Sequence, residues 1–229
     1  KSIRSQWFGQ TDVIFERLRR VLEALDKVVI FVDEADTQFG GVGSTAHETE
    51  RRLTGKIQAM MSDPRLRGRV VWLLMTARIH LLSPDIRRPG RVGDLIIPVL
   101  DPKGDDRKAF INWVLSGVMQ DPGDEDVAKL DGLTEGYSAA GFASVRSHLQ
   151  AYRPDDKSDL PIARAAELVG DHIPPDIGQT RRYQTLQALV NCTRRSLLPL
   201  EAPESLDGYE KRRERWQREI RELEAMGIS

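Results

Sequence analysis

The chain has 229 residues, and its 34 lysine and arginine residues against 35 aspartate and glutamate residues give a formal net charge of −1. This balance points to neither nucleic acid nor a membrane surface as a specific partner. Cys192 is the one cysteine, which excludes an internal disulfide framework and is typical of a reducing compartment such as the cytoplasm. No apolar run approaches the ~18 residues of a membrane-spanning helix, so we expect no membrane span.

The first residues carry an aromatic pair, Trp7 and Phe8, beside Gly9. Adjacent aromatics next to a glycine suit an exposed loop tip, because glycine supplies backbone freedom. An aromatic pair that closes the edge of a core fits equally well. Apolar residues at helical spacing then predict a helix that leads into the next segment. They are Ile14, Leu18, Val21, Leu22 and Leu25.

An uninterrupted apolar run at residues 28–32 ends in two adjacent acids, Asp33 and Glu34. A run without polar alternation predicts a strand buried on both faces, as in the centre of a parallel sheet. Ligands of such sheets collect at the carboxyl ends of the strands. Asp33 there suits a Mg²⁺ ion held through its water shell, and Glu34 suits a group that orients or deprotonates a water. The alternative is an ordinary strand followed by an acidic helix cap.

Residues 37–45 form a glycine-rich connector without the lysine of a phosphate-binding loop. Three further elements are predicted from apolar runs: a helix over 46–61, a buried strand over 70–75 and a third short strand over 95–99. Residues 87–91 place three arginines around a proline and a glycine. Such a presented guanidinium cluster suits phosphate, although a solvated basic turn has the same composition.

Beyond Asp101-Pro102 the composition becomes helical. The predicted helices cover residues 105–118, 124–131, 138–152, 160–170, 179–197 and 208–226, with a polar linker at 153–159. Ser138 or an adjacent residue is expected to cap the helix at 138–152. The last helix is dense in charges of both signs, and this near balance argues against a nucleic-acid-binding arm.

Five motifs in a fixed order make residues 3–151 resemble the AAA family of ATPases, the ring-forming remodelling motors. They are Ser5-Gln6-Trp7-Phe8-Gly9 (aromatic pore loop), Ile30-Phe31-Val32-Asp33-Glu34-Ala35-Asp36 (Walker B), Glu50-Arg51-Arg52, the second region of homology from Met75 to Arg91 with Arg88-Pro89-Gly90-Arg91, and Gly136-Tyr137-Ser138 (lid turn).

The resemblance implies an α/β fold. Residues 1–100 are expected to form the C-terminal part of a P-loop AAA+ parallel-sheet domain, residues 101–153 a small all-helical lid domain, and residues 154–229 a helical C-terminal extension. The Walker A pattern G-x-x-x-x-G-K-[ST] is absent from the sequence. We therefore expect the chain to be a fragment that begins after Walker A.

The resemblance also implies an ATP-binding and ATP-hydrolysing motor that uses ATP and Mg²⁺. It is expected to work as a homo-oligomer, a hexameric ring, that remodels, unfolds or disassembles polypeptide substrates in the cytoplasm. The implied site residues are Glu34, Arg88 and Arg91 for catalysis, Asp33, Thr76 and Gly136 for the nucleotide, Asp33 also for Mg²⁺ through water, and Trp7, Phe8 and Gly9 for the substrate pore loop.

Ala77 departs from the family pattern, which places a polar residue, usually asparagine, directly after Thr76. An alanine side chain cannot hydrogen-bond a phosphate, so either Thr76 takes over or hydrolysis is slow. Two alternatives to the motor therefore stay open. One is a hydrolysis-deficient AAA scaffold that uses nucleotide only for assembly, and the other is a partner-binding module.

The last predicted helix has one narrow apolar stripe, formed by Tyr209, Trp216, Ile220 and Leu223. This stripe suits docking on the lid or on a neighbouring subunit. A solvated helix end is the alternative.

Overall fold

The structure, a computed structural model, describes residues 10–40, 48–156, 158–172, 177–198 and 205–229, and only the backbone of 10–12 and 48–53. The chain forms two compact units: one comprises Lys1–Pro98 together with Gly178–Ser229, and the other Val99–Ile177. Within these ranges, no helix combines the length and the apolar character that crossing a membrane requires.

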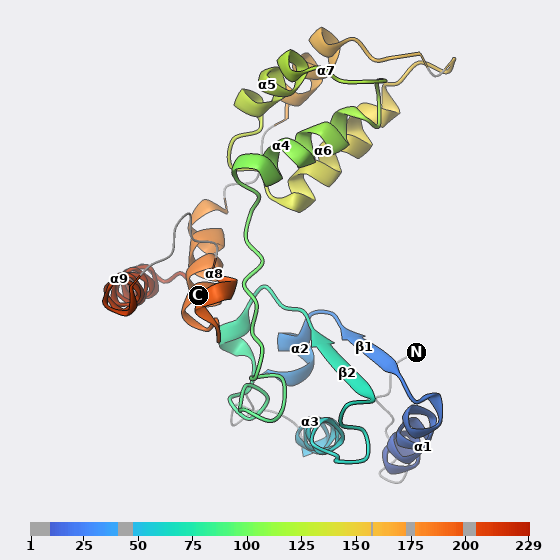
Figure 1. Cartoon of the computed structure of the whole chain (residues 1–229), viewed down its shortest axis with the longest axis vertical. Helices are drawn as coiled ribbons and strands as arrows, with labels where there is room; N and C mark the ends of the chain where they lie inside the picture. The colour runs from blue at the N-terminus through green and yellow to red at the C-terminus, as the bar shows by residue number, and fades with distance from the viewer. Residues whose placement is uncertain (1–9, 41–47, 157, 173–176, 199–204) are drawn as a thin grey trace. The chain divides into compact units, whose positions relative to one another are not determined.

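The first unit is built on two parallel strands, β1 (Val28–Val32) and β2 (Val70–Leu74), paired in register from Val28 with Val70 to Val32 with Leu74 (Figure 1). The other elements of this part of the chain are α1 (Gln10–Leu25), α2 (Ala35–Phe39), α3 (Glu48–Met61) and the 3₁₀ turn η1 (Ile79–Leu81). The predicted helices around residues 14–25 and 46–61 are confirmed as α1 and α3. The short α2 was not predicted.

One face of the sheet is covered by α1 and α3. Phe15 and Leu22 of α1 and Met60 of α3 are buried in one cluster with Leu66 and Val70. The opposite face is open: Val29, Phe31, Val71 and Leu73 are between 42% and 65% exposed. The prediction that these strands are buried on both faces is therefore wrong, because no described helix covers the second face.

Residues 95–99 do not form the predicted third strand, since no described strand lies beside them to accept a ladder of hydrogen bonds. The backbone N–H of Ile96 donates instead to the Thr193 hydroxyl at 2.9 Å. An apolar run of this kind indicates a strand only when another strand edge is available to pair with it.

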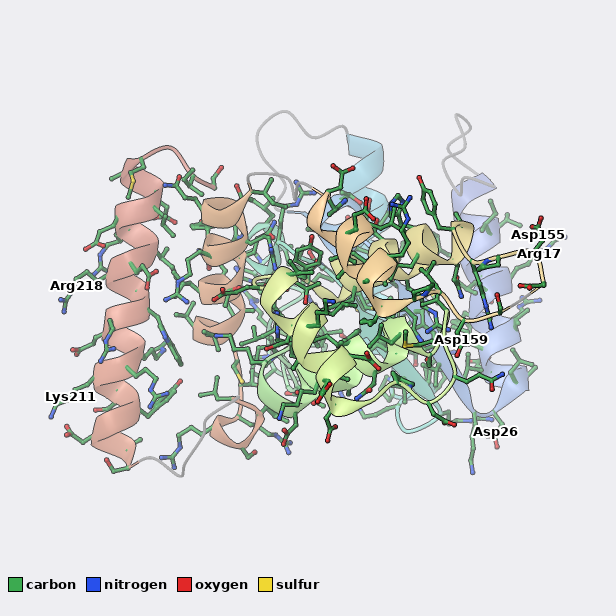
Figure 2. All side chains as sticks on the ribbon, turned by 90° about the horizontal axis from the view of Figure 1, so that it is seen from above. Arg17, Asp26, Asp155, Asp159, Lys211 and Arg218 are labelled. Carbon is green, nitrogen blue, oxygen red and sulfur yellow. The ribbon has the colours of Figure 1, made fainter. Side chains whose placement is uncertain are left out.

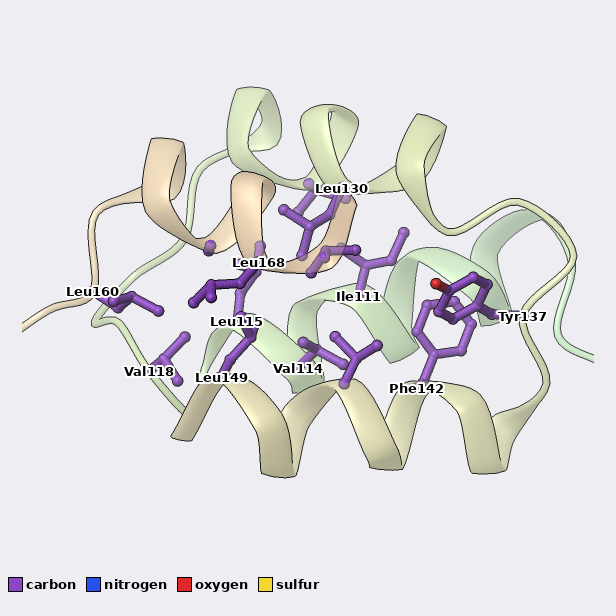
Figure 3. Packing of buried hydrophobic residues seen from close by; sticks show 14 residues of the cluster. Ile111, Val114, Leu115, Val118, Leu130, Tyr137, Phe142, Leu149, Leu160 and Leu168 are labelled. Atoms are coloured by element: carbon purple, nitrogen blue, oxygen red, sulfur yellow. The ribbon is translucent and has the colours of Figure 1, made fainter. Parts of the chain in front are cut away.

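The second unit is all helical and contains α4 (Gly104–Leu115), α5 (Asp124–Leu133), α6 (Ala139–Ala151) and α7 (Ile162–Gly170). Its core is a single cluster of buried side chains that includes Ile111, Leu130, Phe142 and Leu149 (Figure 3). The predicted cap is confirmed, since the Ser138 hydroxyl accepts the Gly141 N–H at 3.1 Å.

The helix α7 belongs to this same core through Ala165, Leu168 and Val169, and Leu160, two residues before the helix, is buried in the same cluster. The expected domain boundaries place it in a C-terminal extension that begins at residue 154. The helical unit of the structure extends to Ile177 instead. The apolar face of α7 explains the difference, because those side chains are buried only by packing against the preceding helices.

The chain then returns to the first unit as α8 (Gly178–Val190), the 3₁₀ turn η2 (Arg195–Leu197) and α9 (Leu206–Ala225). The helices α8 and α9 lie side by side (Figure 2), and Arg182 of α8 binds both carboxylate oxygens of Glu219 at 2.6 and 2.7 Å. This guanidinium lowers the pKa of Glu219 below its ordinary value. Trp216, Ile220 and Leu223 are buried, so the apolar stripe of the tail docks within this chain.

Candidate active site

Two exposed carboxylates stand at the carboxyl end of β1. Asp33 follows the strand directly and accepts the N–H of Glu34 at 2.9 Å, and Glu34 itself has φ 47° and ψ 48°. This left-handed conformation costs a residue with a Cβ on the order of 1–3 kcal/mol and persists only where the surroundings enforce it. Strain of this kind clusters at functional positions and makes Glu34 a candidate for chemistry.

The neighbouring strand and α2 hold Glu34 in this conformation. The N–H of Ala35 donates to the carbonyl of Met75, just beyond β2, at 2.9 Å. The Glu34 carbonyl accepts both the N–H and the hydroxyl of Thr37, at 2.9 and 2.7 Å. The backbone on both sides of Glu34 is therefore fixed, while its side chain stays exposed at the edge of the sheet.

A third acid, Asp36, connects the ends of the two strands. Its side chain is only 4% exposed and pairs with the Arg78 guanidinium at 2.6 Å. The Thr76 hydroxyl donates to the other carboxylate oxygen of Asp36 and accepts the N–H of Arg78 at 2.9 Å. Because a threonine hydroxyl has one proton, Thr76 has none left to donate to a phosphate in this arrangement.

The motif that contains Asp36 predicts no role for this residue. Its position in the sequence places it in the first turn of α2, and its side chain contacts Thr76 and Arg78, which follow β2. The acid three residues after Asp33 was the available signal. Its partners were not predictable from spacing, because Thr76 lies 40 residues further along the chain.

Replacing Thr76 by valine should lower the free energy of unfolding by about 1–3 kcal/mol, since a buried carboxylate then loses a hydrogen-bond donor. Urea denaturation of the full chain measures the change. Thr76→Ser keeps the hydroxyl and should stay close to the wild-type value. A valine variant as stable as the serine variant would show that the contact with Asp36 contributes nothing.

His80 lies in η1 beside this cluster and packs edge-on against Tyr183 of α8, with ring centroids 5.0 Å apart. Neither ring nitrogen has a hydrogen-bond partner among the described residues. Burial, reinforced by the nearby Arg78 charge, lowers the pKa of His80 below its ordinary 6.5. The ring is therefore neutral at pH 7 and serves as an apolar contact between η1 and α8.

The three arginines of residues 87–91 have different surroundings. The Arg88 side chain is 72% exposed and has one ion pair, to Asp85 at 3.2 Å. Arg91 donates to the Asp85 carbonyl at 2.7 Å and to the Ser62 hydroxyl at 3.3 Å, and Arg87 donates to Asn191 at 3.0 Å. Of the three, Arg88 is the one presented to solvent.

The structure brings Asp33, Glu34 and Thr76 together at the carboxyl ends of two paired strands. Gly136 belongs to the separate helical unit, where it adopts φ 74° directly before the buried Tyr137. Its left-handed conformation explains the glycine without reference to a nucleotide. The expected pore loop, Trp7-Phe8-Gly9, lies outside the described residues.

A sequence model described as the ATPase family associated with various cellular activities (AAA) matches residues 1–98. This segment belongs to the AAA family. The AAA segment contains the whole sheet, the acids after β1 and the arginine-rich turn, so its boundary coincides with the point at which the chain enters the helical unit.

Curated relatives extend the similarity past the AAA segment. The cell division cycle protein 48 homolog of Archaeoglobus fulgidus is 30% identical over 146 residues, and the match covers 62% of this chain and 19% of the relative. An AAA ATPase forming ring-shaped complexes from Corynebacterium jeikeium is 27% identical over 150 residues, which cover 63% and 28% of the two chains. The chain thus spans between 19% and 28% of the lengths of these relatives.

A solved structure has the same fold. It is a chain of the structure titled E. coli MS115-1 HORMA:CdnC:Trip13 complex, with a TM-score of 0.60 over 75% of this chain and 60% of that chain. The sequence identity is 16%, so this similarity concerns the fold alone. It agrees with the α/β AAA+ fold expected from the sequence motifs.

The donor set of the AAA segment fits part of a nucleotide site. Asp33 and Glu34 supply exposed carboxylate oxygens, the ligand type that Mg²⁺ and its water shell prefer. No group of three or more histidine, cysteine, aspartate or glutamate residues gathers as a metal site in the described ranges. A Mg²⁺ ion here would therefore be held through water and substrate phosphate, as is usual for this cation.

Proposed function

We propose that the intact protein is an ATP-hydrolysing AAA ring motor of the cytoplasm that remodels, unfolds or disassembles protein substrates. The observation that carries this proposal is Glu34, an exposed carboxylate kept in a left-handed backbone conformation at the end of a parallel strand in an AAA segment. Backbone strain of this kind is concentrated at active sites, which favours a chemical task for this side chain.

In this proposal Asp33 and Glu34 have different roles. Asp33 would hold Mg²⁺ through its water shell, and its contact with the Glu34 N–H fixes its orientation. Glu34 accepts a hydrogen bond from the attacking water and orients it toward the γ-phosphate. When bound, Mg²⁺ supplies positive charge that offsets the charge of the phosphates. Trp7-Phe8-Gly9 is the proposed grip on extended polypeptide.

The turn formed by residues 87–91, the arginine turn, supports the proposal of a ring. Arg88 is exposed and pairs with no described residue except Asp85, so it is available to a phosphate outside its own subunit. Arg91 shares this proposed role, although in the structure it also holds the turn to Asp85 and Ser62. A site completed by a neighbour requires an oligomer, and only a closed ring gives every subunit a neighbour; the relative from Corynebacterium jeikeium is described as ring-forming. We propose six subunits.

A second candidate is a scaffold that binds nucleotide only to assemble. It is favoured by the end of β2, where Ala77 has no polar side chain and the Thr76 proton is donated to Asp36. No described side chain at this position is then free to donate to the γ-phosphate. The motor and the scaffold differ in phosphate release, not in assembly.

ATP turnover by the intact protein, measured against protein concentration, tests the proposal. Specific activity should rise steeply with concentration, because each site needs an arginine from a neighbour. Arg88→Ala should lower turnover about 10³-fold or more, the effect of losing an arginine supplied in trans. Arg65→Ala is the matched control, since Arg65 is an exposed arginine of the same unit paired with Asp63.

Activity that is independent of concentration would contradict the ring. Nucleotide binding without phosphate release at any concentration would favour the scaffold over the motor.

A further inference from the structure

The arginine turn is bound to a helix that lies about a hundred residues further along the chain. The Arg87 guanidinium donates to the side-chain oxygen of Asn191, one residue past α8, at 3.0 Å, across 104 residues of sequence. The Asn191 amide nitrogen in turn donates to the Gln187 carbonyl of α8 at 2.9 Å. This second bond orients the amide, so that its oxygen is the atom that faces Arg87.

A second tie joins the same two segments. The Thr193 hydroxyl accepts the Ile96 N–H at 2.9 Å, and the Thr193 N–H donates back to the Ile96 carbonyl at 3.4 Å. Asp94, two residues before Ile96, accepts the Gly90 N–H with both carboxylate oxygens, at 3.0 and 3.1 Å. The contact with Thr193 therefore reaches the tip of the arginine turn through Asp94.

The turn itself has little room to adjust. A Cβ at Gly93 would lie 1.8 Å from the Arg87 carbonyl oxygen, so the two ends of the turn are in close contact. Ile86, directly before Arg87, is completely buried. With both ends fixed, the direction in which Arg88 projects depends on how Arg87 and Ile96 are held.

We propose that Asn191 is a positioning residue for the arginine turn, with Thr193 as its second point of attachment. This inference rests on the proposed role of Arg88. The chain leaves the first unit after Pro98, forms the helical unit, and returns at Gly178 into the helix that precedes Asn191. Asn191 thus connects the direction in which Arg88 projects to α8, the helix with which the chain returns to the first unit.

Hydrogen exchange of the 229-residue chain tests the positioning directly. Asn191→Ala should raise the exchange rate of amides in residues 87–96 about five-fold, the effect of losing one part-buried hydrogen bond. Arg87→Ala removes the same contact from the other side without touching α8 and should give the same local effect. Asn191→Asp keeps an acceptor for Arg87 and should restore slow exchange. Thr185→Val is the matched control, because its hydroxyl donates only to the Arg181 carbonyl within α8.

ATP turnover of the intact protein gives the second measurement. Asn191→Ala should lower turnover without weakening nucleotide binding, and Asn191→Asp should recover it. Unchanged exchange at residues 87–96 in both Asn191→Ala and Arg87→Ala would overturn the positioning role. An exchange effect in a protein whose wild type releases no phosphate would instead leave the positioning intact and refute the motor.

Discussion

Replacing Glu34 by glutamine in the intact protein should lower ATP turnover by about 10²-fold or more while ATP binding is retained. The amide has the size and shape of the carboxylate but cannot take a proton from water. The backbone contacts that hold this residue, from Met75 and Thr37, involve no side-chain atom of Glu34, so the fold should not change. Phosphate release and nucleotide affinity, measured on the same preparation, separate the two effects.

Glu125→Gln is the matched control, because Glu125 is an exposed glutamate in the first turn of α5 in the other unit. It should leave both quantities unchanged. Turnover of the Glu34→Gln variant equal to that of the wild type would show that Glu34 takes no part in hydrolysis. Asp33 and Glu34 would then be an ordinary acidic helix cap after a strand.

The largest effect on stability is expected from Phe142→Ala, which should cost the helical unit about 3–5 kcal/mol. Phe142 is 1% exposed, and its ring stacks on Phe110 with centroids 5.6 Å apart. The Arg107 guanidinium lies over the same ring at 5.8 Å. Removing the ring leaves a cavity in the centre of the only core this unit has among its described residues, and the loss of transfer energy adds to the cavity term.

Native-state hydrogen exchange of the α4 and α6 amides measures this change within the helical unit. Tyr152→Ala is the matched control, since Tyr152 closes the same helix but is 48% exposed. Its effect should be a fraction of that of Phe142→Ala. Equal effects of the two variants would mean that the cluster around Phe142 does not determine the stability of this unit.

Local sequence patterns predicted most of the elements. The apolar runs at 28–32 and 70–75 became paired strands, and the helix expected to be capped by Ser138 or an adjacent residue is capped by Ser138. Residues 95–99 have the same kind of composition but form no strand. The apolar pattern indicates that a segment favours the strand conformation. A strand also requires the edge of another strand to pair with, and the sequence of the segment contains no information about that edge.

The candidate site was predictable to the extent that it is local. Asp33 and Glu34 follow an apolar run, so their place at the edge of the sheet could be inferred from neighbours in sequence. The pairing of Asp36 with Arg78 depends on which strand lies beside β1. The hydrogen bond between Arg87 and Asn191 joins two residues that are separated in the sequence by the whole helical unit. Contacts of this range are decided by the tertiary structure and have no signature in spacing.

At Glu34 the requirements of stability and of activity conflict, because the left-handed backbone lowers stability while the carboxylate is proposed to serve hydrolysis. Glycine adopts φ 47° without the strain that a Cβ introduces, so a glycine at this position would relax the backbone after β1. A library of variants selected for heat resistance alone would therefore be expected to enrich Glu34→Gly, and a selection for phosphate release would be expected to reject it. Comparing the two selections at this one codon would reveal whether the protein tolerates a less stable fold in order to keep a carboxylate there.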